Sequence, residues 1–287
     1  MIVIIGKSGQ LAQGLVELSK QQKIDSVCYG REDIDLFSVE DIVAKLSAIK
    51  ATALVNASAY TAVDKAETDE NNAYALNEKA VLNLSLACKA LGIHLVHVST
   101  DYVFAGDKGS PYLPDDNIAP TGIYGASKAA GEHALLCEYA QHSCVLRTSW
   151  VYSPFGNNFV KTMLRLMQEK PELGVIDDQI GSPTSVTTLA QVCLQAAAQK
   201  LTGVHHVSDE GVASWYDFAC AIQQLGYEIG ILSSKIPIKP ITTKAYPTPA
   251  KRPAYSVMSK ASLKQALPSV TLPHWREALV DVVSRLK

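Results

Sequence analysis

Several features that would narrow the class of this protein are missing from its 287 residues. No stretch of about 18 apolar residues runs without a charge or a breaker, so we expect no membrane-spanning helix. The chain opens directly on Met1-Ile-Val-Ile-Ile-Gly6. Because no basic segment with a longer apolar run and a cleavage site is found there, we expect no signal peptide. The sequence also has no internal repeat and no low-complexity tail.

An excess of charge of one sign is absent as well. The chain has 26 basic and 28 acidic residues, which gives a formal net charge of −2. Such a balance produces no field that would attract nucleic acid or an anionic membrane surface. We therefore expect neither of these as a partner, and we expect a small molecule as the ligand.

The cysteines and histidines lack the spacing of disulfide frameworks and metal sites. A chain of this size does not need disulfides, and no Cys-x-x-Cys occurs. We predict reduced thiols in a cytoplasmic protein, and we predict no metal site among the seven histidines. The cysteines are Cys28, Cys88, Cys137, Cys144, Cys193 and Cys220.

Short apolar runs of the kind found in buried parallel strands recur in the first half of the chain. They are Ile2–Ile5, Ser26–Tyr29, Ala53–Asn56, Leu95–Ser99 and Cys144–Arg147. Segments with apolar residues at helical intervals alternate with them, at Leu11–Lys20, Val39–Ile49, Asn72–Leu91 and Lys128–Tyr139. This alternation predicts an α/β fold with a Rossmann-like, doubly wound parallel sheet and helices on both faces.

Prolines and glycines interrupt the pattern after about residue 150. A helix at Thr187–Gln199 and a strand at His205–Val207 are expected to return to the sheet. Ile236–Tyr255 is rich in proline, so we expect an extended loop without regular structure there. A helix over Trp275–Leu286 is expected to follow.

This pattern of strands and helices predicts two lobes. Residues 1–150 are predicted to form an NAD(P)-binding Rossmann domain, rejoined by about 185–207. About 151–184 and 208–287 are predicted to form a smaller C-terminal substrate-binding lobe.

A glycine-rich loop follows the first strand and opens the first helix. In Gly6-Lys-Ser-Gly9-Gln-Leu-Ala12, the glycines let the backbone turn tightly and approach a pyrophosphate, while the helix start offers free N–H groups. A plain strand-to-helix turn is the alternative. The predicted cofactor contacts in this loop are Gly6, Ser8, Gly9, Gln10 and Leu11.

The second strand is followed by Gly30-Arg31-Glu32-Asp33, where a ribose-binding acid is usual. An arginine at this place suits the 2′-phosphate of NADPH, so Arg31 favours NADPH, and the two acids leave NADH open. Asp35 and Leu36 are predicted to line the adenine pocket.

Tyr124 and Lys128 are four residues apart in Tyr-Gly-Ala-Ser-Lys, so one helical turn would place a phenol and an ammonium on one face. A cation beside a phenol favours the phenolate and lowers a pKa that is ordinarily about 10. The pair could therefore run acid–base chemistry on an alcohol or a carbonyl. The same spacing also occurs by chance on solvated helix faces.

Polar segments follow three of the predicted strands and recur later in the chain. They are Asn56–Glu67, Ser99–Phe104, Arg147–Tyr152, Gly156–Phe159, Asp178–Thr184 and Tyr246–Pro253. With the glycine loop and Tyr124–Lys128, their order and spacing resemble the extended short-chain dehydrogenase/reductase superfamily, and within it the dTDP-4-dehydrorhamnose reductase family. The resemblance covers residue 2 to about 260.

This resemblance implies NAD(P)H-dependent reduction of the C4 carbonyl of dTDP-4-dehydro-L-rhamnose, in the biosynthesis of nucleotide sugars for cell-surface polysaccharide. Tyr124 would protonate the C4 oxygen. Thr100 would hydrogen-bond the same oxygen, and Lys128 would bind the nicotinamide ribose and lower the pKa of Tyr124.

The resemblance also assigns binding residues for a nucleotide-sugar substrate and for the cofactor. Further cofactor contacts are Ala57, Ala59, Tyr60, Thr61, Tyr124 and Lys128. Substrate contacts are Thr100, Asp101, Tyr102, Trp150, Asn158 and Arg252, with Arg252 at the diphosphate. Core packing is the alternative for Trp150. Asn77 matches an asparagine that helps to order the active site in relatives, and a solvated helix asparagine is the alternative.

The sequence departs from the family pattern at two places. Relatives often have Arg-Pro-x-Asn-Ser where this chain has Arg252-Pro-Ala-Tyr255-Ser. Some relatives form dimers through a divalent metal, and Mg²⁺ enters only by this resemblance. Gly14 stands near the position of one of the metal-binding glutamates, which argues against a metal-linked dimer. Monomer and homodimer are both left open.

The sequence leaves three alternatives to reduction of this substrate. A reductase or epimerase could act on another nucleotide-linked 4-keto sugar. A dehydratase needs a carboxylate base after Thr-Asp, and this chain has Tyr102 there. A non-catalytic NADP-binding subunit, like the regulatory subunit of methionine adenosyltransferase, would have little reason to keep Thr100, Tyr124 and Lys128 together.

Overall fold

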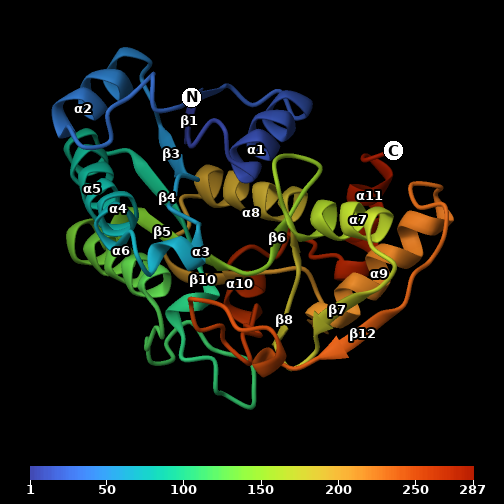
Figure 1. Ribbon diagram of the computed structural model, residues 1–287. Helices are drawn as coiled ribbons and strands as arrows, with labels where there is room; N and C mark the ends of the chain where they lie inside the picture. Colours follow the sequence, from blue (N-terminus) through green and yellow to red (C-terminus); the bar gives the residue numbers. More distant parts are fainter.

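Six short apolar segments form one parallel sheet in the computed structural model, which describes residues 1–287 (Figure 1). The strand order is β10-β5-β4-β3-β1-β2. This arrangement confirms the predicted α/β fold with a doubly wound sheet. The strands are β1 (Ile2–Ile5), β2 (Ser26–Tyr29), β3 (Ala53–Asn56), β4 (His94–Thr100), β5 (Ser143–Thr148) and β10 (Gly203–Val207).

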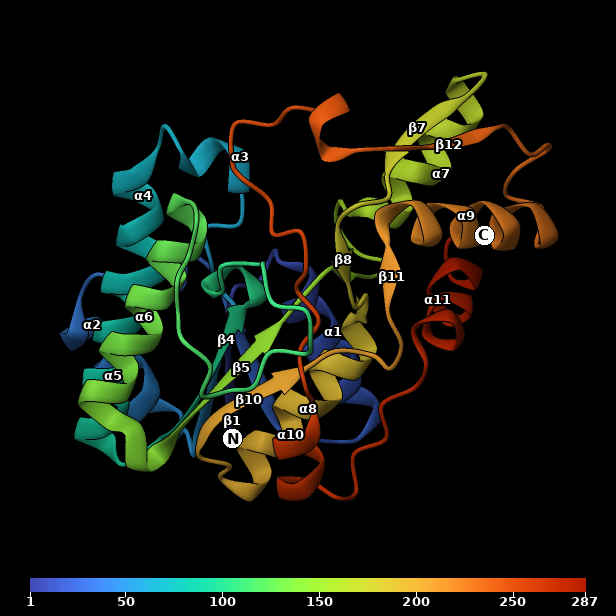
Figure 2. The same ribbon diagram turned by 90° about the horizontal axis from the view of Figure 1, so that it is seen from below.

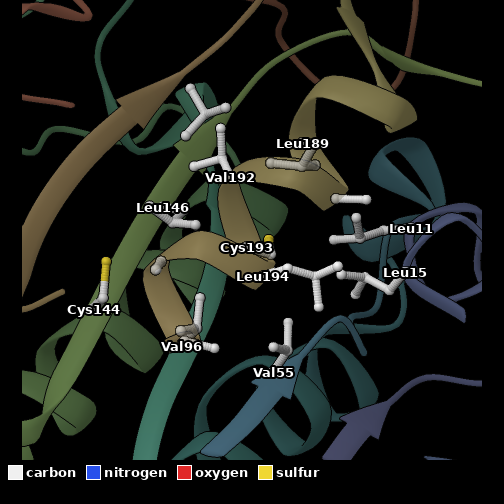
Figure 3. Close-up of a cluster of buried hydrophobic side chains, with 14 of the residues drawn as sticks. Leu11, Leu15, Val55, Val96, Cys144, Leu146, Leu189, Val192, Cys193 and Leu194 are labelled. Atoms are coloured by element: carbon white, nitrogen blue, oxygen red, sulfur yellow. The ribbon is translucent and has the colours of Figure 1, made fainter. Parts of the chain in front are cut away.

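Side chains alternate between the two faces of the sheet, because successive residues of a strand point in opposite directions. One face packs against α2 (Val39–Ala48), α5 (Ala80–Leu91) and α6 (Ile123–Tyr139). The other face packs against α1 (Gln10–Gln21) and α8 (Val186–Gln199). Figure 3 shows leucines of these two helices around Val55 and Val96 of the sheet. Both faces are therefore covered, as parallel sheets require.

The predicted helix Asn72–Leu91 is continuous but changes its winding. It begins as α4 (Glu70–Tyr74), passes through a π-helical turn at Ala75–Lys79 and continues as α5. Gly92 closes it in the left-handed conformation, with φ of +65°. A π turn of this kind widens one turn of a helix and often lies at a functional site.

A second hydrophobic core lies beside the sheet, on the side where α7, α9 and α11 gather in Figure 2. It is built around Tyr152, Phe218 and Trp275, which are all at most 1% exposed. The helices are α7 (Phe159–Glu169), α9 (Trp215–Glu228) and α11 (Trp275–Ser284). The predicted boundaries of the two lobes stay a prediction.

The prediction that Ile236–Tyr255 has no regular structure is wrong. Ile238–Ile241 forms strand β12, which pairs in parallel with β7 (Leu173–Ile176), and a 3₁₀ turn covers Thr243–Ala245. Pro240 is tolerated because β12 has a single neighbour, so the missing N–H is not needed for a second ladder.

The remaining elements are short. Two further strand pairs connect the sheet to the second core: β6 (Val151–Tyr152) with β9 (Thr184–Ser185), and β8 (Ile180–Gly181) with β11 (Ala213–Ser214). Helix α3 (Val63–Ala66) follows β3, and α10 (Ala261–Ala266) packs against β10. The remaining 3₁₀ turns cover Asp101–Val103 and Ala140–His142. None of the helices combines the length and the apolar character needed to cross a bilayer.

Candidate active site

A cavity of about 620 Å³ opens where the strand order reverses, between β1 and β3. The carboxyl ends of β1, β2 and β3 lead into its walls, as is usual for ligand sites of doubly wound sheets. The volume is that of a typical small-molecule or cofactor site. Among the predicted cofactor contacts, those that line the cavity are Gly6, Ser8, Gly9, Arg31, Asp35, Leu36, Ala57, Ala59 and Tyr60.

The glycine loop fits the phosphates of a dinucleotide. Gly6 has φ of +115°, and a Cβ atom there would lie 3.0 Å from the backbone of Ala57 and Ser58. Gly9 precedes the first turn of α1, where no side chain caps the N–H groups and no acidic residue is present. Free N–H groups at the positive end of a helix dipole form an anion site. The loop therefore offers backbone donors to a pyrophosphate.

The charges beside the loop leave Arg31 without an ion-pair partner. Lys7 Nζ lies 3.1 Å from both Glu32 Oε1 and Asp33 Oδ2 and thereby engages the two acids. Asp33 also accepts a 2.8 Å hydrogen bond from Gly30 N. Arg31 is exposed on the cavity wall and forms no salt bridge. Its guanidinium is thus available for a phosphate monoester.

Four of the predicted contacts have other surroundings. The side chain of Leu11 is only 8% exposed and packs in the core, so only its backbone can face a phosphate. Gln10 Oε1 accepts from Ser153 Oγ at 2.7 Å and from Asn158 Nδ2 at 3.0 Å. Asn158 Oδ1 caps α7 at Lys161 N, so its amide is used within the protein. Thr61 is exposed and outside the cavity lining.

Asn77 orders the cavity wall at Tyr60. Its Oδ1 accepts from Tyr60 N at 2.8 Å, and its Nδ2 donates to Tyr60 O and to Ser127 Oγ. It is 1% exposed and lies in the π turn, not on a solvated helix face. The Tyr60 segment and helix α6, which carries Ser127, are therefore held in a fixed relation.

Tyr124 lies in the first turn of α6, beside the end of β4. Glu67 Oε1 accepts from Ile123 N at 2.9 Å and so caps this helix end. At Gly125, a Cβ atom would lie 2.2 Å from Tyr102 O, so only glycine permits this close approach. The close contact brings Tyr124 to Tyr102, and their rings meet edge to face with centroids 5.4 Å apart.

Burial raises the pKa of Tyr124, while a hydrogen bond with Thr100 opposes that effect. Lys128 is not among the groups that shift the pKa of Tyr124, so the expectation that it lowers this pKa is not met. Because its pKa is raised, the phenol keeps its proton at neutral pH. Thr100 is 5% exposed and donates to Asp101 Oδ1 at 3.0 Å.

Lys128 is 1% exposed on the same helix. Its Nζ donates to Val98 O at 2.7 Å and lies 3.2 Å from His97 Nε2. Burial lowers its pKa to about 8, and Glu132 on the next turn opposes this shift. Lys128 can therefore change its protonation state close to neutral pH.

Three further predicted substrate contacts lie near Tyr124 and Lys128. Asp101 is 2% exposed, and burial raises its pKa to about 6 against hydrogen bonds that include one from Thr100. Tyr102 accepts a 3.0 Å hydrogen bond from Arg252 Nη1. Arg252 Nη2 forms a 2.7 Å ion pair with Asp64 of α3. This pair ties α3 to the chain after β12, which runs past α3 in Figure 2.

Trp150 follows β5 in a strained conformation, with φ of +49°. Its ring stacks on Trp215 with centroids 3.6 Å apart and an interplanar angle of 8°. The indole also lies over Gly181, where a Cβ atom would be 2.7 Å away. Trp150 thus packs against the second core on one side and is only partly buried.

Asp64 and Glu67 were not predicted individually, although the Asn56–Glu67 segment contains both. His97 lies in the fourth strand and Trp215 starts α9. Their roles depend on partners far away in the sequence.

No group of three or more His, Cys, Asp and Glu side chains is arranged to hold a metal ion.

A parallel sheet with a glycine loop at its switch point and a Tyr-x-x-x-Lys pair on the helix beside β4 defines a Rossmann-type protein of the short-chain dehydrogenase/reductase class. The family model described as the RmlD substrate binding domain matches residues 1–287. A dTDP-4-dehydrorhamnose reductase of Sinorhizobium fredii is 38% identical over 284 residues, which cover 96% of this chain and 94% of that protein.

Solved structures agree with the sequence match. A dTDP-4-dehydrorhamnose reductase of Clostridium acetobutylicum superposes with a TM-score of 0.92 at 35% identity, covering 99% of both chains. The enzyme of Bacillus anthracis, solved in complex with NADP, has a TM-score of 0.90 at 35% identity, covering 98% of this chain and 97% of that one. The chain belongs to the dTDP-4-dehydrorhamnose reductase family.

Proposed function

We propose that this protein reduces the C4 carbonyl of dTDP-4-dehydro-L-rhamnose to give dTDP-L-rhamnose, with NADPH as the reductant. The observation that carries the proposal is Tyr124, which lies beside Thr100 at the end of β4 and one helical turn from the buried Lys128. Family membership supplies the substrate, and the cavity at the switch point supplies a site for the dinucleotide.

NADPH, when bound, supplies the hydride for the carbonyl carbon. Tyr124 holds its proton at neutral pH because burial raises its pKa, so it is suited to give that proton to the C4 oxygen. Thr100 offers a hydroxyl beside the phenol, and its hydrogen would turn from Asp101 Oδ1 to the C4 oxygen to stabilise negative charge there. Lys128, held at Val98 O, is positioned one turn from the phenol.

The preference for NADPH rests on Arg31. Lys7 engages Glu32 and Asp33, so these acids are less free to accept from a ribose 2′-hydroxyl. Lys7, Arg31 and Lys65 are the cations that line this cavity, and Arg31 is the one without an ion pair, so its guanidinium is available for a 2′-phosphate. The structure of a relative at 35% identity contains NADP, which supports this choice.

The substrate is proposed to lie between Tyr124 and the second core. Tyr102, Asp101 and Trp150 surround the place where the sugar would react, and Arg252 is the cation for its diphosphate. For this role, Arg252 would exchange part of its pairing with Asp64 for phosphate oxygens. Residues about 151–184 and 208–287 then form the substrate lobe.

The proposed setting is the cytoplasm, where nucleotide sugars are made and where six free cysteines would stay reduced. Monomer and homodimer both suit the proposal, because every residue assigned a role comes from one chain.

The test is oxidation of NADPH by the purified protein when dTDP-4-dehydro-L-rhamnose is added. Tyr124→Phe removes the proton donor and is expected to lower kcat by about 10²- to 10⁴-fold. NADPH binding, followed by its fluorescence, should stay close to that of the parent. Tyr139→Phe, in a buried tyrosine at the end of the same helix, is the control and should keep full turnover. Parent-like turnover of Tyr124→Phe would refute the assignment of Tyr124 as the acid.

A further inference from the structure

Lys128 is one end of a buried chain of hydrogen bonds that starts at the cavity wall. Ser58 N donates to Asn56 Oδ1 at 3.1 Å, and Ser58 Oγ lies 2.6 Å from the same oxygen. Asn56 Nδ2 lies 3.1 Å from His97 Nδ1, and His97 Nε2 lies 3.2 Å from Lys128 Nζ. Asn56 and His97 are register partners on β3 and β4 and are at most 1% exposed.

The chain of bonds has a fixed direction, because its first member can only donate. The backbone N–H of Ser58 requires an acceptor, so Asn56 must turn its oxygen toward Ser58. The amide nitrogen of Asn56 then faces His97 Nδ1, and this nitrogen also can only donate. His97 Nδ1 is therefore the acceptor, and the single ring proton of neutral His97 is on Nε2.

No other arrangement satisfies the same atoms. Turning the amide of Asn56 by 180° would place NH₂ against the N–H of Ser58. Turning the ring of His97 would place carbon atoms against Asn56 and Lys128, and both hydrogen bonds of the imidazole would be lost. Burial keeps the pKa of His97 well below its usual value, so the ring stays neutral.

The N–H of His97 Nε2 therefore points at Nζ of Lys128. An ammonium group has no acceptor, so it would meet the N–H of His97 donor to donor. A neutral amine has a lone pair that accepts from His97 Nε2, while one of its N–H bonds still donates to Val98 O at 2.7 Å. We propose that His97, oriented by Asn56, is a positioning residue that stabilises the neutral amine of Lys128 and so sets its protonation state.

Other groups around Lys128 do not supply this effect. Charged groups on neighbouring elements are Asp101 in the 3₁₀ turn after β4 and Arg147 on β5, while Glu132 is on α6 itself. Apart from burial, only Glu132 acts appreciably on the pKa of Lys128, and it favours the ammonium. Glu132 is itself paired with Arg147 at 2.7 Å. His97 is thus the neighbour whose hydrogen-bonding direction favours the amine.

The catalytic consequence rests on the proposed function. If Lys128 must be charged when Tyr124 gives up its proton, activity falls at the alkaline side where Lys128 becomes neutral. His97 brings that limit to a lower pH. The tautomer of His97, in contrast, can be measured without substrate, cofactor or turnover.

The direct test is ¹⁵N NMR of the cofactor-free protein labelled at histidine, with the signals of His97 assigned by their loss in His97→Gln. The expected result is a neutral ring at pH 7 with the proton on Nε2. A proton on Nδ1, or a charged ring at pH 7, would overturn the proposal even if the reductase activity were demonstrated. Absence of reductase activity would leave this measurement unaffected.

Asn56→Asp is the matched variant, because it keeps the shape but replaces the donor at His97 Nδ1 by an acceptor. The ring proton is then expected on Nδ1, which turns the Nε2 lone pair toward the ammonium of Lys128. The alkaline limit of kcat should move up by about one pH unit or more, a tenfold change in proton affinity. His97→Phe with Asn56→Asp keeps the new carboxylate without the imidazole. An equal shift between His97→Phe alone and that double variant would mean that the charge of the carboxylate acts without the imidazole, and the proposal would fail.

Discussion

Replacing Glu132 by glutamine should reveal the free energy that depends on a buried ion pair next to the site. Arg147 and Glu132 side chains are 2% and 1% exposed. Arg147 Nε lies 3.0 and 3.1 Å from the two carboxylate oxygens of Glu132, and Nη2 donates to Oε2 at 2.7 Å. Nη1 donates to Pro114 O at 3.0 Å, and the guanidinium lies 5.0 Å from the ring of Phe104. Glu132→Gln leaves this guanidinium buried without a counter-charge.

The expected loss is about 3–5 kcal/mol of unfolding free energy, the usual cost of removing one partner of a buried pair. For a chain of this length, each kcal/mol lowers Tm by roughly 2–4 °C, so a drop of about 6–20 °C is expected in a calorimetric or circular-dichroism melt. Glu132→Gln should also change the pKa of Lys128. Glu132 raises the pKa of Lys128, so its loss should lower that pKa further and move the alkaline limit of activity to lower pH.

The control is Glu132→Leu combined with Arg147→Met, which removes both charges. Apolar replacement of a buried pair is often neutral or stabilising, so most of the lost Tm should return, less the cost of the unpaired Pro114 carbonyl. If Glu132→Gln melts within about 2 °C of the parent, or if the double variant is no more stable than the single one, the reasoning is refuted.

Two other predictions concern charged side chains of the site, Arg31 and Lys128. Arg31→Ala should weaken NADPH binding by about 10- to 100-fold, the value of a charge-assisted phosphate contact, and should leave the Kd for NADH nearly unchanged; equal weakening of both would contradict the role of Arg31. Lys128→Met should remove a charge-burial penalty of about 3 kcal/mol at pH 7, because burial lowers the pKa of Lys128 from 10.5 to about 8, and the unpaired Val98 carbonyl and His97 ring offset part of that gain. Between those two values the unfolded chain binds the proton that the folded protein has lost, so the parent gains stability as pH rises. The advantage of Met should therefore shrink in urea denaturation at pH 9.5 compared with pH 7, and an advantage equal at both pH values would count against a depressed pKa.

The first half of the fold could be predicted from short-range pattern. Strands β1, β2 and β3 lie at the predicted residues, because their apolar runs are bounded by turns and are buried in β1 and β3 and partly buried in the edge strand β2. The helices α1, α2 and α8 lie within one or two residues of the predicted bounds, since their apolar periodicity is strong. Strand β12 was missed because prolines usually signal irregular chain, and only its edge position beside β7 makes Pro240 acceptable.

Some residues of the candidate site could likewise be predicted from local sequence, and others depend on tertiary contacts. The residues of the glycine loop, Arg31, and the Tyr124–Lys128 pair could be found from sequence, because each lies in a local segment with its own chemistry. The engagement of Lys7 with Glu32 and Asp33 could not, since it depends on how two loops meet. Neither could the internal pairing of Arg252 with Asp64, which are distant in the chain.

By itself the sequence determined the α/β class, the glycine loop and the Tyr124–Lys128 pair proposed as the acid and its lysine, because these depend on residue type and local spacing. Only the tertiary structure decided the protonation chemistry. Burial, not a neighbouring cation, controls the pKa of Tyr124, and the register of β3 with β4 places Asn56 against His97 and His97 against Lys128. Desolvation and hydrogen-bond direction depend on neighbours in space, and a linear sequence does not specify them.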